Sequence, residues 1–288
     1  MLTNPRRRAL LAGIAALMAK DALPQDREKL PRIGLGTWQT FDVGNDAAAR
    51  APLREVLQLL DGHVVDSSPM YGSSEIVVGD LVAELGIRER LFIATKVWTR
   101  GREAGIAQME TSFRRLRVQV MDLMQVHNLV DVATHAKTLQ DMKAKGRVRH
   151  TGITHYTASA YPEVERAMQI APWDFLQINY SLAERDSEKK ILPMAKDRGM
   201  RVLINRPFGE GSLFRRVKGK ALPPWAAELG IATWAQYFLK WIVSHPAVTC
   251  AIPGTSNPRH MKDNLGAGQA PFPDAAQRKR MAEHFDGL

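Results

Sequence analysis

Eight short apolar segments, each followed by a segment of helical character, constrain the fold of this chain more than any other feature. Their residues run continuously apolar, which is typical of parallel strands that are buried on both faces of a sheet. Eight strand–helix units in about 250 residues predict a single (β/α)8 TIM barrel of the α/β class. The expected strands are residues 32–38, 63–68, 91–98, 121–128, 147–154, 175–181, 200–208 and 247–254.

The segments between these strands carry the spacing and the end signals of helices. In residues 133–145 Ala133, Ala136, Leu139 and Met142 recur every three positions, and Gly146 follows. Such spacing predicts one apolar helix face and a stop at the glycine. The expected helices are residues 46–60, 74–85 with Ser74 as its cap, 104–116, 133–145, 158–170, 187–198 with Pro193 inside, 233–244 and 257–265.

An open, doubly wound sheet is the alternative architecture for such a chain. That fold requires a glycine-rich turn between its first strand and its first helix. The sequence "IGLGTW" has glycines, but it lacks the GxGxxG pattern leading into a helix. We therefore expect one domain over residues 29–288, folded as the barrel.

The charge balance excludes one class of partner and favours another. The 288 residues include 40 Lys and Arg against 30 Asp and Glu, a net charge of +10. The positive residues are scattered and form no basic stripe with interleaved aromatics, so we expect no nucleic-acid partner. A positive field favours an anionic ligand or cofactor. The single cysteine, Cys250, lies in an apolar run and is expected to be a small buried side chain, with a reactive thiol as the alternative.

Residues 1–28 have a different character from the rest of the chain. Three arginines at residues 6–8 precede an apolar stretch, residues 9–19, which is too short for a stable membrane span of ~20 residues. This order is that of a secretory signal, and the run from Arg7 to Leu11 resembles the twin-arginine export pattern. We expect residues 1–28 to be a signal peptide that leads to a periplasmic protein. A disordered tail on a cytoplasmic protein is the alternative.

Polar residues end three neighbouring expected strands, where a barrel carries its chemistry. They are Asp66, with Tyr71 in the loop after it, Lys96 and His127. A lysine in an apolar strand is costly unless its charge is paired, and Asp66 on the adjacent strand is the expected partner. Each residue taken alone also has a purely structural interpretation. The carboxylate of Asp66 could cap a turn, Tyr71 could pack over the rim of the barrel, and His127 could be a hydrogen-bonded histidine of the core.

Together, these four side chains predict acid–base chemistry. A phenol has a pKa of ~10, which is high for proton transfer near neutrality. The ammonium of Lys96 is expected to lower the pKa of Tyr71, while Asp66 keeps Lys96 charged. Tyr71 would then protonate a carbonyl oxygen that His127 orients, as a hydride reaches the carbon.

The motifs around these residues resemble those of the aldo/keto reductase family. "GLGTW", Asp66 with the "SSPMYGSSE" that follows it, "ATKVW", "QVHN", "KGRVRHTGIT", "QINYS" and "IPGTSNPRHMKDNLGA" occur in the family's order and spacing, over about residues 31–266. The resemblance implies a barrel that binds NADP(H) in an extended form and reduces a small carbonyl substrate. It makes Asp66, Tyr71, Lys96 and His127 the catalytic tetrad, and it places Trp38 and Trp98 at the substrate.

The same resemblance implies a set of cofactor contacts. Asn205 stands where the family commonly has a tyrosine that stacks on the nicotinamide, and Gly254 stands where many members have a lysine for the 2′-phosphate. Thr154 and His155 replace the usual Ser-Asn pair that binds the carboxamide. The implied cofactor contacts are Thr37, Thr154, His155, Gln177 and Arg206, then Gly209 and Leu213 in a segment that resembles the pyrophosphate loop, Thr255, Ser256, Arg259 and His260 at the 2′-phosphate, and Asp263 and Asn264 at the adenine.

The leading functional hypothesis is a carbonyl reductase that is a monomer and needs no metal ion. One alternative makes Lys96 a Schiff-base nucleophile, as in a lyase. Another is an exported barrel that binds the cofactor and turns over little substrate. Detection of cofactor binding without steady-state reduction of carbonyl compounds would favour the last of these.

Overall fold

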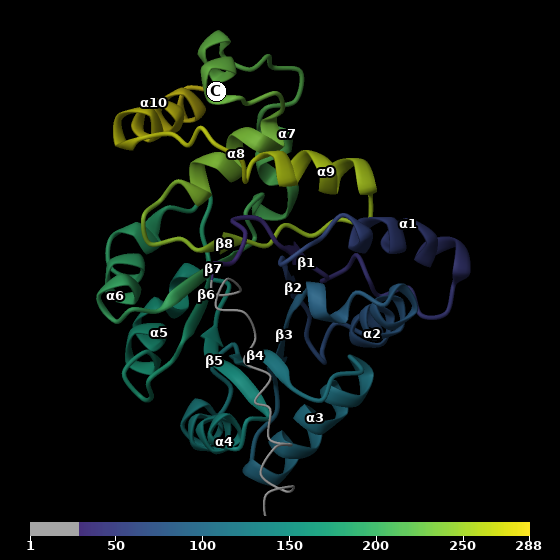
Figure 1. The fold of residues 1–288 in the computed structure, drawn as a ribbon. Coiled ribbons are helices and arrows are strands. Elements are labelled where there is room, and N and C mark those ends of the chain that lie inside the picture. Colours follow the sequence, from purple (N-terminus) through teal and green to yellow (C-terminus); the bar gives the residue numbers. More distant parts are fainter. Residues whose placement is uncertain (1–28) are drawn as a thin grey trace, which may run out of the picture.

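The computed structural model describes residues 29–288, so the predicted signal peptide lies outside the described residues. All eight expected strands are present, and they form one parallel sheet in chain order. Figure 1 shows them at the centre of the molecule. The strands are β1 Leu35–Gly36, β2 Val64–Asp66, β3 Phe92–Val97, β4 Met121–His127, β5 Val148–Thr154, β6 Phe175–Asn179, β7 Arg201–Asn205 and β8 Cys250–Ala251.

The last strand returns to the first and closes the sheet into a barrel. The backbone N–H of Gly34 donates to Ala251 O at 2.8 Å, and that of Gly36 donates to Pro253 O at 3.1 Å. A β-carbon at Gly36 would lie only 2.8 Å from the carbonyl oxygen of Ile252. Glycine is therefore required for this close approach. The predicted TIM barrel is confirmed, and the open-sheet alternative is excluded.

Helices surround the strands (Figure 1), and every expected helix has a counterpart in the structure. The short helix α7 and the C-terminal helix α10 were not expected from the sequence. The helices are α1 Ala47–Gln58, α2 Ser74–Leu85, α3 Arg102–Arg115, α4 Val132–Ala144, α5 Tyr161–Ala167, α6 Ile191–Asp197, α7 Ser212–Arg216, α8 Trp234–Val243, α9 Pro258–Gly266 and α10 Ala275–Asp286. None of the helices within residues 29–288 could cross a membrane on its length and hydropathy.

The expected cap at Ser74 is wrong. Ser74 is the first helical residue of α2, and Ser73 occupies the N-cap position without a side-chain cap bond. The Ser73 hydroxyl instead donates to Asp42 Oδ1 at 2.7 Å. Ser74 is buried, and its hydroxyl donates to Thr37 O at 3.5 Å. Both serines at the start of α2 therefore bond to the segment after β1, and neither side chain caps the helix.

Three other helices differ in detail from the expectation. In α4 Ala136, Leu139 and Met142 are buried, but Ala133 is exposed, so the apolar face begins one turn later. Short 3-10 turns replace the first turns of the helices expected at 158–170 and 187–198. Pro193 is the third residue of α6, where a backbone N–H has no intrahelical acceptor, so the helix tolerates it.

The inward-facing residues change character along the strands. Val64, Ala94, Leu123, Phe175, Leu203 and Cys250 belong to one buried apolar cluster. Two positions further along their strands stand Asp66, Lys96, Gln125, Gln177 and Asn205. Because side chains alternate along a strand, these polar residues point into the barrel in the next layer. The barrel therefore has an apolar floor and a polar layer at its C-terminal end, as barrel enzymes do.

Cys250 is a fully buried member of the apolar floor, as expected. Burial raises the pKa of its thiol, so the reactive thiolate is disfavoured. The alternative of a reactive cysteine is therefore not supported.

Candidate active site

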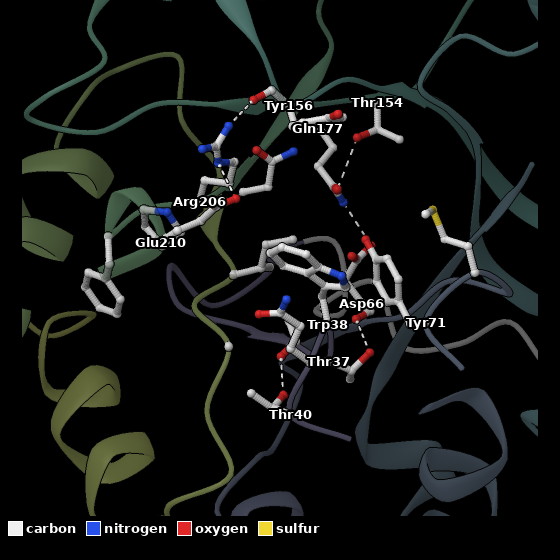
Figure 2. A pocket seen from close by; sticks show the side chains of 18 of the residues that line it. Thr37, Trp38, Thr40, Asp66, Tyr71, Thr154, Tyr156, Gln177, Arg206 and Glu210 are labelled. Carbon is white, nitrogen blue, oxygen red and sulfur yellow. Dashed lines mark hydrogen bonds and ion pairs between the residues drawn. The ribbon is translucent and has the colours of Figure 1, made fainter. Parts of the chain in front are cut away.

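A cavity of about 670 Å³ opens above the polar layer. This volume lies within the usual range for small-molecule sites. Figure 2 shows Asp66, Tyr71, Thr154 and Gln177 converging on it, with Trp38 close by. The residues that line it come from several strand ends and from the loops that follow them.

Asp66 and Lys96 form a buried ion pair at the base of this cavity. Lys96 Nζ donates to Asp66 Oδ2 at 2.6 Å and to Ser67 O at 2.8 Å. The amides of Gln125 and Gln177 donate to Asp66 Oδ1, at 3.2 and 2.9 Å. The expected pairing is confirmed, and the carboxylate serves this network rather than capping a turn.

Lys96 is held as an ammonium. Burial alone lowers the pKa of its amine, but the charge of Asp66 comes next in size and, together with the interactions with Tyr71 and the hydrogen bonds to both residues, more than offsets that effect. The pKa of Lys96 is therefore raised above its usual value. A permanent positive charge stands beside Tyr71, with the ammonium nitrogen 5.0 Å from the centroid of the phenol ring.

A tight turn after β2 places Tyr71 against Lys96 and His127. The Tyr71 N–H donates to Ser68 O at 3.0 Å, and Gly72 follows with a φ of +59°. Glycine adopts this left-handed conformation without strain. The ring of Tyr71 meets the ring of His127 edge-on, with centroids 5.8 Å apart. Tyr71 therefore reaches across the mouth from the loop that the sequence suggested.

The expectation that Lys96 lowers the pKa of Tyr71 below its usual value is wrong. Burial raises the pKa of the phenol, and this effect exceeds the opposing effects of the charge and hydrogen bond of Lys96. The net pKa of Tyr71 is therefore above its usual value. The hydroxyl keeps its proton through neutral and moderately alkaline pH, as a general acid must.

His127 is a neutral imidazole. Burial, the charge of Lys96 and the nearby His155 together lower the pKa of its ring to about 2. The side chain is 5% exposed and lines the cavity. A neutral ring carries one N–H, so His127 can donate one hydrogen bond and accept another.

Five of the expected cofactor and substrate residues line the cavity: Thr37, Trp38, Thr154, Gln177 and Arg206. The Thr154 hydroxyl donates to Gln177 Oε1 at 3.1 Å, so both ends of the glutamine amide have partners (Figure 2). Thr37 donates to Asp66 O at 3.0 Å. Trp38 is 45% exposed at the rim.

Other expected residues lie beside the cavity rather than on its wall. The ring of His155 stacks on Tyr156. Trp98 is 42% exposed, with its ring centroid 6.4 Å from that of His127. Gly209 begins the turn before α7, and Leu213 is buried beneath it.

The residues expected at the 2′-phosphate and adenine lie in α9 and in the segment just before it. They are Thr255 and Ser256 before the helix, and Arg259, His260, Asp263 and Asn264 within it. Arg259 is exposed in the first turn of the helix. Asp263 accepts from the Thr233 hydroxyl at 2.7 Å and from the Gln236 amide at 2.8 Å. Within the described residues, Asp263 thus joins α9 to the start of α8.

The structure adds residues that the sequence interpretation did not include in the site. Tyr156 and Glu210 are two of them, and both contact the predicted residue Arg206 (Figure 2): Arg206 Nη1 donates to Tyr156 O at 2.9 Å, and Arg206 Nε lies 3.3 Å from Glu210 Oε1. Ser68 is fully buried, and its Oγ lies 3.0 Å from His127 Nδ1. The position of Ser68 in the sequence, between Asp66 and Tyr71, was the available signal.

Within residues 29–288 no group of three or more His, Cys, Asp and Glu could hold a metal ion.

Comparison with known proteins shows the family of this chain. The family model described as "Aldo/keto reductase family" matches residues 32–284. The chain belongs to the aldo/keto reductase family. Among curated family members, the Methylglyoxal reductase YeaE of Escherichia coli (strain K12) is 29% identical over 250 residues, which cover 82% of this chain and 84% of the relative. The Aldo-keto reductase YhdN of Bacillus subtilis (strain 168) is 30% identical over 63% of this chain and 60% of the relative.

Solved aldo/keto reductase structures share the barrel. An aldo/keto reductase from Klebsiella pneumoniae in complex with NADP and acetate superimposes with a TM-score of 0.73 and is 26% identical, covering 89% of this chain and 92% of that one. The family resemblance of the sequence motifs is thereby confirmed, and the (β/α)8 fold is the family's fold.

Proposed function

We propose that this protein reduces an aldehyde or ketone to an alcohol with NADPH, and that Tyr71 donates the proton. The observation that carries the proposal is the buried Asp66–Lys96 pair beneath Tyr71, with neutral His127 beside it. A protonated phenol next to a fixed ammonium is suited to give a proton to a developing alkoxide. Methylglyoxal reductase activity in a 29% identical relative supports the same reaction class.

The polar wall of the cavity fits a nicotinamide cofactor. Asn205 Nδ2 donates to His155 O at 3.0 Å, whereas its buried Oδ1 has no partner among residues 29–288. An unpaired buried acceptor is costly, and a ligand amide would satisfy it. Asn205, Thr154 and Gln177 would hold the carboxamide of the cofactor. Arg206 also lines the cavity, and its guanidinium would bind the cofactor's diphosphate. The bound cofactor would supply the hydride.

The side chains supply the remaining steps. His127 and Tyr71 would both donate hydrogen bonds to the carbonyl oxygen and thereby orient the carbon toward the incoming hydride. As negative charge develops on that oxygen, Tyr71 transfers its proton to it. The Lys96 ammonium stabilises the phenolate that is left, and Asp66 keeps that ammonium in place.

The lyase alternative conflicts with the state of Lys96. A Schiff base requires a free amine, but the Lys96 side chain is fully buried, its pKa is raised, and its nitrogen donates to Asp66 and Ser67. We therefore do not propose covalent catalysis.

Titration of the purified protein with NADPH and NADH, followed by a panel of aldehydes and ketones, tests the proposal. We expect saturable NADPH binding and cofactor oxidation that depends on the carbonyl compound. Tight cofactor binding without turnover across the panel would instead indicate the cofactor-binding barrel. The choice between the cofactors needs this measurement, because an NADH-specific methylglyoxal reductase of Escherichia coli (strain K12) is also a relative, at 22% identity.

Arg259 provides a prediction about that choice. It is an exposed guanidinium in the first turn of α9, and a guanidinium pairs well with a phosphate. Arg259→Ala should raise the Kd for NADPH about tenfold and leave the Kd for NADH within about twofold, as measured by fluorescence titration. Arg280→Ala, which removes the same charge from exposed α10, is the control. Equal losses for both cofactors would show that Arg259 does not recognise the 2′-phosphate.

A further inference from the structure

The hydrogen bond between Ser68 and His127 has two possible directions, with different consequences for catalysis. Ser68 Oγ lies 3.0 Å from His127 Nδ1, and both side chains are buried. If Nδ1 carries the proton, the ring's other nitrogen faces the cavity as an acceptor. If the serine is the donor, Nε2 carries the proton and faces the cavity as a donor. Only the second arrangement can bind a carbonyl oxygen.

The surroundings of Ser68 favour the serine as donor. The backbone N–H of Met70 donates to Ser68 Oγ at 3.4 Å, so the oxygen is already an acceptor. Within residues 29–288 the only acceptor within reach of the Ser68 hydroxyl proton is His127 Nδ1. Were Nδ1 protonated, the hydroxyl proton would be left buried without a partner, which is unfavourable.

The second ring nitrogen has the opposite environment. Nε2 has no hydrogen-bond partner in the part of the chain that the structure describes, and it is not among the fully enclosed polar atoms. His127 lines the cavity, and the ring of Tyr71 stands edge-on to it. Nε2 is thus the nitrogen available to a ligand beside the Tyr71 hydroxyl.

We propose that Ser68 is a positioning residue, whose hydroxyl donates to Nδ1 of His127 and so holds the proton on Nε2, where it binds the substrate carbonyl oxygen. The proposal rests on the proposed carbonyl reduction for its catalytic consequence, but the direction of the hydrogen bond can be measured without turnover. Ser68 touches neither substrate nor cofactor in this scheme. It acts through the tautomer and the orientation of the ring.

Long-range ¹H–¹⁵N correlation spectra of the full chain labelled at histidine, together with steady-state kinetics, test the proposal. Comparison with a His127→Gln sample identifies the His127 signals. In the wild type we expect a non-protonated Nδ1 and a protonated Nε2. In Ser68→Ala the two nitrogens should shift toward each other as the ring exchanges between tautomers. The kcat for carbonyl reduction should fall about tenfold, the effect of losing one hydrogen bond, while the Kd for NADPH stays unchanged.

Two further variants separate positioning from folding. Ser68→Thr retains the hydroxyl and should restore both the wild-type spectrum and most of kcat. Ser187→Ala removes another fully buried serine, outside the cavity, and should leave both unchanged. A proton on Nδ1 in the wild type, or an unaltered spectrum and kcat in Ser68→Ala, would overturn the role of Ser68. Absence of wild-type turnover would instead overturn the proposed function. The histidine spectrum tests the role of Ser68 and the wild-type kinetics test the proposed function, so the two outcomes can be told apart.

Discussion

Replacing Tyr71 by phenylalanine should lower kcat for carbonyl reduction by a factor of about 10² to 10⁴, the usual contribution of a general acid. The change removes only the hydroxyl, so the ring still packs edge-on to His127 and still lies over the Lys96 ammonium. The Kd for NADPH should remain within about twofold of the wild type, because the cavity keeps its shape. Stopped-flow measurement of a single turnover checks the chemical step directly.

Tyr237→Phe is the matched control for this variant. The Tyr237 hydroxyl is buried and donates to Met281 O at 2.8 Å, between α8 and α10 and outside the cavity. Its loss should cost about 1 kcal/mol of stability and leave kcat unchanged. If Tyr71→Phe turned over as fast as Tyr237→Phe, Tyr71 would not be the proton donor.

The raised pKa of Tyr71 also determines how the wild-type rate varies with pH. Because burial keeps the phenol protonated, the rate of reduction should be constant through neutral pH and fall only above the usual phenol pKa of ~10. The reverse reaction, oxidation of the alcohol, needs the phenolate and should rise with pH. A fall in the rate of reduction near pH 7 would contradict this assignment, since His127, with its pKa of about 2, does not titrate there.

The barrel was predictable because its strands are apolar along their whole length, and because the inward residues turn polar at a common level. Asp66 and Lys96 could be paired from the sequence, since an unpaired lysine in an apolar strand is too costly to occur by accident. Two things could not be predicted in this way. The net pKa of Tyr71 depends on the balance between its burial and the charge of Lys96, which only packing reveals. The contact of Ser68 with His127 joins residues 59 positions apart, so the position of Ser68 between Asp66 and Tyr71 places it near the site but does not indicate that partner.

The C-terminal part of the fold was also beyond the sequence interpretation. Helix α10 has its buried residues at Met281 and Phe285 only, so its apolar pattern is too sparse to predict a packed helix. Its position depends on tertiary contacts such as the bond from Tyr237 to Met281 O. Likewise, Asp263 was expected near an adenine, but in this structure its side chain accepts hydrogen bonds from Thr233, the N-cap of α8, and from Gln236 in α8.

The second large effect is expected at Lys96. Lys96→Met keeps the approximate length of the side chain and removes its charge. Among residues 29–288, the buried Asp66 carboxylate then keeps only its two side-chain amide donors. Breaking a buried ion pair in this way costs about 3–5 kcal/mol, so the melting temperature should fall by roughly 5–10 °C. The kcat should fall at least as far as in Tyr71→Phe, because the phenolate loses the ammonium that stabilises it.

Two further variants show how much of the loss of activity in Lys96→Met comes from reduced stability and how much from the missing ammonium. Lys240→Met removes a second buried lysine, whose ammonium donates to Gln269 O at 2.7 Å and to Pro271 O at 2.8 Å, away from the cavity. It should lower the melting temperature but leave the kcat of the folded protein unchanged. Adding Asp66→Asn to Lys96→Met removes the uncompensated charge, so part of the stability should return while turnover stays lost. Were activity to return together with stability, Lys96 would act only through the fold, and the stabilisation of the Tyr71 phenolate would have to come from another group.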